Sequence, residues 1–200
     1  GWFGFNAGSA LAADSIAVSA FLCTNTAAAV AALTWGLISH FRTGKISAVG
    51  VATGAVAGLV AITPASGFVG VMGSMAIGIA AGALCFIAVE VINKTGLDDS
   101  LDVFAVHGIG GIIGALLTGV FAVEAIGGTP GMIEGNSNLL LDQLIGVVAT
   151  GGYSFIVTLG ILFVLDKIPG LGLRVTTLDE DQGLDISLHG ERGSVRDGAD

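Results

Sequence analysis

The chain contains the stretch Val103-Phe-Ala-Val-His-Gly-Ile-Gly-Gly-Ile-Ile-Gly-Ala-Leu-Leu-Thr-Gly-Val-Phe-Ala-Val123, in which His107 is the one ionisable side chain. About 20 apolar residues in an α-helix are enough to cross the hydrocarbon core of a bilayer. An ionisable side chain inside such a span is costly, and it most often marks a path for something polar. The stretch therefore predicts a membrane-spanning helix that carries a functional histidine.

The composition of the whole chain also indicates a membrane protein. Of its 200 residues, 53% are apolar, 12% are charged and 33 are glycine. A soluble domain of this length needs a more charged surface, whereas membrane helices use glycine for close packing. Half of the 16 acidic residues fall in residues 166–200, so acidic side chains are concentrated in a tail. No basic patch points to nucleic acid.

Further apolar segments predict an all-α, polytopic membrane helix bundle. The segments are 16–41, 47–63, 68–92, 102–123 and 139–165, and residues 1–10 read as the end of a preceding span. The second segment is short and stops at Thr63-Pro-Ala-Ser-Gly67, where Pro and Gly break a helix. We predict a transmembrane region over 1–165 and a tail over 166–200. Because the chain is apolar from its first residue and shows no signal peptide, we expect it to be a piece of a longer protein.

The positions of the cations predict the orientation of the bundle. The connections 10–15, 64–67 and 124–138 contain no Lys or Arg, and all seven cations lie in the alternate connections or the tail. Cytoplasmic connections are enriched in Lys and Arg. We therefore predict a multi-pass protein of the inner or plasma membrane with a cytoplasmic C-terminus.

Small residues repeat at four-residue spacing along three of the predicted helices. Such stripes let neighbouring helix backbones approach closely, and packing alone is the favoured interpretation of them. Cys23 and Cys85 have no third partner, so we interpret them as packing residues and predict neither a disulfide nor a metal site. The stripes consist of Gly50, Gly54 and Gly58; Gly78 and Gly82; and Gly110 and Gly114.

Two interpretations of His107 remain open. Asp102 is in position to cap the N-terminus of its helix, and at about 1.5 Å per residue His107 then lies roughly 8 Å into the membrane. The imidazole is either a neutral hydrogen-bonding group that holds two helices together or a pore-lining group that relays protons. His40 lies at the cytoplasmic end of the segment 16–41 and His189 lies in the tail, so neither is placed deep inside a span.

The opening Gly1-Trp-Phe-Gly-Phe-Asn-Ala-Gly-Ser9 is dense in aromatic residues and ends in small polar ones. These aromatic rings either anchor a helix end at the membrane interface or form a vestibule whose π faces attract a cation. In the second interpretation, Ser9 accepts a hydrogen bond from that cation.

Four segments of the chain resemble the ammonium transporter (Amt/Mep/Rh) family in the expected order and spacing. They are Gly1–Ser9, Ala57-Gly-Leu-Val-Ala-Ile-Thr-Pro-Ala-Ser-Gly67, Asp98-Asp-Ser-Leu-Asp-Val-Phe-Ala-Val-His-Gly108 and Gly183-Leu-Asp-Ile-Ser-Leu-His-Gly-Glu191. The family has eleven spans, built as two inverted five-helix repeats and a final long helix. The resemblance implies that this chain is the second half of such a transporter, from the end of span six to the tail.

The resemblance also implies a role for individual residues. Phe5 is expected to be one of two stacked phenylalanines that gate the pore, and Ser9 to contribute to the outer ammonium site. Trp2 and Val103 are expected to line the pore, with Thr63 as a substrate contact. His107 is expected to be the second of two histidines that share a proton across the pore.

The tail segment resembles the part of the family that docks PII-type signal proteins in bacteria and archaea. Its expected regulatory residues are Gly183, Asp185, His189, Gly190 and Glu191. The sequence departs from the family pattern after Glu191, where Arg192-Gly-Ser194 follows. The family forms trimers, so the resemblance implies a homotrimer in the lipid bilayer.

The function that these residues favour is transport of ammonium or ammonia, with methylammonium as a further substrate, in nitrogen metabolism. A dry lumen excludes both ammonium and potassium as ions, but ammonium can give up its proton and cross as ammonia. No covalent chemistry and no cofactor are needed, so we do not predict an enzyme. The alternatives are an ammonium sensor of the same fold, a structural membrane subunit, and an intramembrane serine hydrolase that would use Ser66; the hydrolase motif Gly-x-Ser-Gly is absent.

Overall fold

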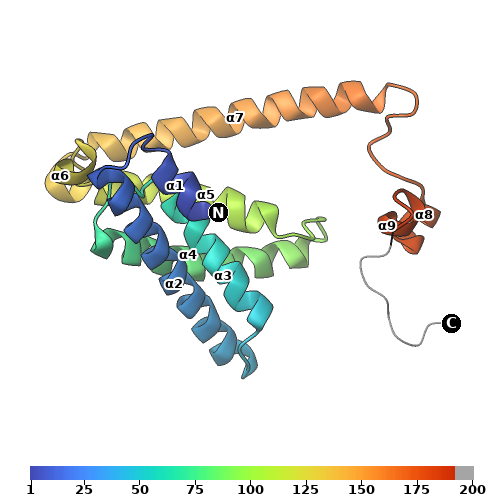
Figure 1. The fold of residues 1–200 in the computed structure, drawn as a ribbon. Helices are drawn as coiled ribbons and strands as arrows, with labels where there is room; N and C mark the ends of the chain where they lie inside the picture. The colour runs from blue at the N-terminus through green and yellow to red at the C-terminus, as the bar shows by residue number, and fades with distance from the viewer. Residues whose placement is uncertain (192–200) are drawn as a thin grey trace. The chain divides into compact units, whose positions relative to one another are not determined.

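The computed structural model describes residues 1–191, which are helical and contain no β-strand. The chain forms two compact units, Gly1–Ala149 and Thr150–Asp200. The helices are α1 (Trp2–Gly8), α2 (Ser15–Thr43), α3 (Ala48–Ile62), α4 (Val71–Thr95), η1 (Val103–Gly108), α5 (Ile109–Phe121), α6 (Glu124–Gly127), η2 (Met132–Glu134), α7 (Asn138–Asp166), α8 (Thr177–Gln182) and α9 (Leu184–Ser187) (Figure 1).

Four helical segments are long and apolar enough to span a membrane: α2, α4, the continuous pair η1 and α5, and α7. The helix α3 has 15 residues and is shorter, as the sequence predicts. The prediction of an all-α, polytopic membrane helix bundle is thus confirmed. The predicted spans are also correct to within a few residues, except that the fourth begins with a π-helical turn, η1, in place of an ordinary α-helix.

Local sequence explains where the helices of the first unit begin and end. The Asp14 carboxylate accepts a hydrogen bond from the backbone of Ala17 (2.9 Å), and the Ser47 hydroxyl accepts one from Gly50 (3.2 Å). Such side chains satisfy the free N–H groups of a first helical turn. At its other end, α2 stops at Gly44, whose φ of 74° is easily adopted only by a residue without Cβ.

The predicted glycine stripes of α3 and α4 both lie against the backbone of α2. A Cβ atom on Gly58 would be 2.5 Å from the carbonyl oxygen of Ala27, and one on Gly78 would be 2.7 Å from the same oxygen. The same arrangement recurs one turn along α2, at Ala31, Gly54 and Gly82. Because only hydrogen fits at these positions, the three helices pack backbone to backbone.

The helix α5 packs on α3 and α4 through the third stripe. Gly110 lies against Val60 and Cys85, and Gly114 lies directly against the backbone of Ala61. The chain reverses between α3 and α4 at the predicted break, where Val69 forms an antiparallel bridge with Ala122 at the end of α5. This bridge ties the start of α4 to the end of α5.

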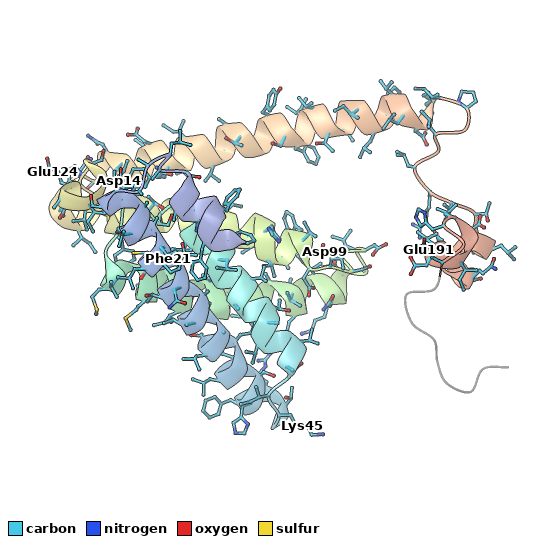
Figure 2. All side chains as sticks on the ribbon, viewed as in Figure 1. Asp14, Phe21, Lys45, Asp99, Glu124 and Glu191 are labelled. Atoms are coloured by element: carbon cyan, nitrogen blue, oxygen red, sulfur yellow. The ribbon has the colours of Figure 1, made fainter. Side chains whose placement is uncertain are left out.

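The connections that lack cations lie together at one end of the first unit. Figure 2 shows Asp14 and Glu124 at this end, and Lys45 and Asp99 at the far ends of α2 and of the α4–α5 pair. The helices therefore alternate in direction, as the distribution of Lys and Arg predicts.

The second unit contains residues 150–166 of α7 and the short helices α8 and α9. The hydroxyl of Thr176 accepts a hydrogen bond from the backbone of Asp179 (3.3 Å) at the start of α8, and Arg174 pairs with Glu180. Gly183, with a φ of 93°, separates α8 from α9. This unit holds the tail residues that the sequence singles out.

Candidate functional site

The indole of Trp2 lies at the centre of the predicted pore residues. Its ring centroid is 5.9 Å from that of Phe5 and 6.3 Å from the imidazole of His107. Its Nε1 donates a hydrogen bond to the Thr63 hydroxyl at 2.8 Å. Thr63 and His107 are 61 and 105 positions away from Trp2 in the chain, and both lie beside its indole.

Thr63 reaches Trp2 from the C-cap position, directly after the last residue of the short helix α3. Its hydroxyl accepts from Trp2 and donates to the backbone oxygen of Leu59 at 2.8 Å. The proton of the Thr63 hydroxyl is therefore used in the hydrogen bond to Leu59 of α3, and its oxygen is the acceptor for Trp2. The observed contact is with the indole, so Thr63 positions Trp2 in the described structure, and its expected contact with substrate stays a prediction.

Two polar residues that sequence reasoning missed hold α1 in place. The amide of Asn6 donates to the hydroxyl of Thr24 (2.9 Å), and this hydroxyl donates to the backbone oxygen of Ala20 (2.6 Å). Both side chains are buried, and α1 gains a further contact where Phe3 stacks on Phe21 at 4.2 Å. An asparagine among aromatic residues was the available signal, since a buried amide needs a polar partner.

Phe5 and Ser9 border a hollow of about 220 Å³ at the end of α1. Phe5 is 62% exposed in this chain. The Ser9 hydroxyl donates to the backbone oxygen of Phe5 (2.7 Å), which leaves its lone pairs free to accept. The hollow is also lined by Asn6, Thr63, Ser66 and Phe68, so it combines aromatic faces with several hydroxyl groups.

His107 lies in the π-helical turn η1, and its side chain is exposed. Within residues 1–191 its ring neighbour is Trp2, and no hydrogen bond joins the imidazole to another described group. An imidazole that merely holds two helices together needs such a bond, so residues 1–191 contain no partner for that role. Val103, four residues earlier, is 52% exposed.

The prediction that the Asp102 side chain caps this helix is wrong. Asp102 occupies the N-cap position with a φ of 53°, but its carboxylate makes no capping hydrogen bond. The carboxylate of Asp99 takes that role, accepting from the backbone N–H groups of Val103, Phe104 and Ala105. Burial and the nearby Asp99 charge raise the pKa of Asp102.

The tail residues gather around α9. Gly183 precedes this helix, the backbone N–H of Gly190 bonds to the oxygen of Ile186 (3.2 Å), and that of Glu191 bonds to the oxygen of Asp185 (2.9 Å). His189 directly precedes Gly190 in the chain. The departure from the family pattern at 192–194 falls outside the described residues.

Cys23 and Cys85 are buried free thiols on different helices, consistent with packing roles. No group of three metal-ligating side chains is found among residues 1–191.

Comparisons with known proteins give one consistent result. Residues 1–194 match the model of the Ammonium Transporter Family. The ammonium transporter Amt1 of Archaeoglobus fulgidus is 47% identical over 191 residues, which cover 96% of this chain and 48% of that protein. Thus the chain spans about half the length of the curated relatives it matches.

Solved structures agree with this match. The crystal structure of Saccharomyces cerevisiae Mep2 is 39% identical with a TM-score of 0.84, covering 88% of this chain and 41% of that one. A structure named Sensor Amt Protein is 34% identical with a TM-score of 0.82, covering 94% of this chain and 45% of that one.

Proposed function

Because this chain belongs to the ammonium transporter family, we propose that it forms part of a membrane pore that conducts ammonium as ammonia and a relayed proton. The observation that carries the proposal is the meeting of Trp2, Phe5, Thr63 and His107 on one face of the first unit. The match to the Ammonium Transporter Family favours transport over the serine hydrolase alternative.

Recognition of the cation takes place at the end of α1. The faces of Trp2 and Phe5 attract a positive charge through their ring quadrupoles. Ammonium has four N–H donors, and the lone pairs of the Ser9 hydroxyl accept from one of them. Phe5 then acts as a gate that separates this outer site from the narrow part of the path.

Selectivity follows from the cost of dehydration. Removing a cation from water into an apolar passage lined by Val103 costs far more than the passage returns. Potassium has no way to reduce this cost. Ammonium gives its proton to a relay along the pore and crosses as neutral ammonia, which takes up the relayed proton on the other side. One positive charge therefore moves for each molecule.

His107 carries the proton in this scheme. An imidazole has two ring nitrogens, one a donor and the other an acceptor, so it can take up a proton at one nitrogen and release one from the other. The position of its ring beside Trp2, which also lies next to Phe5, supports this role. A second histidine from another part of the protein completes the relay.

The remaining assignments are part of the same proposal. The protein is an eleven-span, inverted-repeat homotrimer of the plasma membrane, with residues 1–165 in the transmembrane region and 166–200 in a cytoplasmic tail. The absence of Lys and Arg from alternate connections supports this orientation. A PII-type signal protein docks on Gly183–Glu191 of the tail.

The test is His107→Leu in the full-length protein, expressed in cells that lack other ammonium transporters. We expect uptake of labelled methylammonium to fall to background while the amount of protein in the membrane stays constant. His40→Leu is the matched control, because His40 lies at the end of α2 away from the pore residues, and it should retain uptake. Undiminished uptake in His107→Leu would refute the relay.

The structural match to the Sensor Amt Protein favours one second candidate, an ammonium receptor. A receptor binds ammonium without moving it. Proteoliposomes that hold the purified protein distinguish the two functions: a transporter generates an ammonium-dependent current, and a receptor shows binding with no current.

A further inference from the structure

Asp99 makes an unusual set of contacts in the turn that precedes His107. One carboxylate oxygen accepts from the backbone N–H of Val103 (2.8 Å), and the other accepts from Phe104 (3.0 Å) and Ala105 (3.2 Å). Figure 2 shows Asp99 at the tip of the connection between α4 and η1. A charged acceptor that takes three N–H groups fixes the position of the first turn strongly.

The turn that Asp99 holds is not an ordinary helical turn. The backbone N–H of Ile109 bonds to the oxygen of Phe104, five residues earlier, so η1 is wound more widely than an α-helix. Single π-helical turns are rare and occur often at functional sites. In such a turn, the direction in which His107 points depends on where the turn begins and on how wide it is.

The rest of the span is held by other contacts. Gly110 and Gly114 fasten α5 against α3 and α4, and Ala105 and Val106 are buried. The helix therefore has a fixed position without Asp99. Asp99 fixes the backbone conformation of η1, which lies between the connection and α5. This segment contains both Val103 and His107.

We propose that Asp99 is a positioning residue for transport: its carboxylate fixes the π-helical turn and thereby holds the His107 imidazole beside Trp2 on the conduction path. The proposal rests on the proposed function of His107. The neighbouring carboxylates do not share this role, because Asp98 accepts only from the Ser100 side chain among the described residues and Asp102 makes no capping bond.

The decisive variant is Asp99→Asn in the full-length protein, with Asp98→Asn as the matched control. Both changes remove one negative charge from the same connection, but only Asp99→Asn replaces an acceptor oxygen with an NH₂ group that faces backbone N–H groups. We expect the maximal rate of methylammonium uptake per transporter to fall about tenfold in Asp99→Asn. The KM should change less than twofold, since the outer site lies on α1. Asp98→Asn should change neither value.

The result separates positioning from simple stability. If Asp99 only stabilises the fold, the amount of protein in the membrane falls while the rate per molecule stays normal, and the proposal is overturned. If Asp99→Asn does not reach the membrane, Asp99→Ser, which keeps one acceptor oxygen, is measured with the same expectation. A normal rate per molecule in that variant also overturns the proposal.

The experiment also distinguishes this inference from the function on which it rests. Loss of uptake in His107→Leu together with a normal rate in Asp99→Asn refutes positioning alone. Normal uptake in His107→Leu refutes the relay itself.

Discussion

Two regions of the first unit are built in opposite ways. One is the interface of α2 with α3 and α4, and the other is the face that carries Trp2, Thr63 and His107. The interface is regular: glycines at four-residue spacing bring three helices into backbone contact, and Ala27 and Ala31 are fully buried there. The other face lies where helices are irregular, at the short helix α1, at the end of α3 and in the π-helical turn η1.

This difference indicates how a bundle with so few polar groups can hold a precise site. Backbone packing fixes the scaffold without any polar side chain. The functional side chains then depend on a small number of single hydrogen bonds, such as those from Trp2 to Thr63 and from Asn6 to Thr24. Changes to the scaffold should therefore act on folding, and changes to the irregular face should act on transport.

The largest effect is expected from Gly58→Leu, which breaks the scaffold. Its side chain would overlap the backbone of Ala27 and the Cβ of Ala31, which no rotamer avoids. We expect little folded protein, as measured by size-exclusion chromatography of the detergent-solubilised transporter. Gly172→Leu is the control, since Gly172 lies in the tail beyond the spans and a Cβ there would make only an ordinary contact, 3.8 Å from the backbone oxygen of Arg174. Equal amounts of folded protein from both variants would contradict the role of the stripe.

A smaller effect, on transport alone, is expected from Thr63→Val. Valine keeps the shape of threonine but removes the acceptor of the Trp2 indole, and one net hydrogen bond corresponds to a change of about threefold to tenfold. Uptake of methylammonium should fall by this factor while the thermal stability changes little. Thr63→Ser, which keeps the hydroxyl, should restore most of the uptake. If serine and valine behave alike, the hydrogen bond does not matter.

The smallest effect is expected from Asp102→Asn, measured as stability against pH. The pKa of Asp102 is raised in the folded protein above its ordinary value of 3.8, so its carboxylate form opposes folding. Asparagine should therefore raise the melting temperature slightly above the folded-state pKa. This gain should shrink as the pH falls through that pKa and disappear below 3.8. A lower melting temperature of Asp102→Asn at pH 7 would contradict the direction of the shift.

Much of the fold followed from the sequence because membrane helices are specified locally. Long apolar segments, the Pro-Gly break after Thr63 and the spacing of the glycines are features of neighbouring residues. The prediction for Asp102 failed for the same reason. A local rule identifies an acidic residue before a helix as its cap, but the left-handed backbone at Asp102 and the π-helical turn after it bring Asp99 to the N–H groups.

The sequence by itself determined that this is a multi-span helical membrane protein with one histidine well inside an apolar span. The hydrophobic length of a segment and the cost of an imidazole at membrane depth depend only on composition and order. Only the tertiary structure decided which residues share a site. Trp2, Thr63 and His107 are far apart in the chain. They meet because glycine-tight packing brings α3 and the η1–α5 segment so close that one indole lies beside both Thr63 and His107.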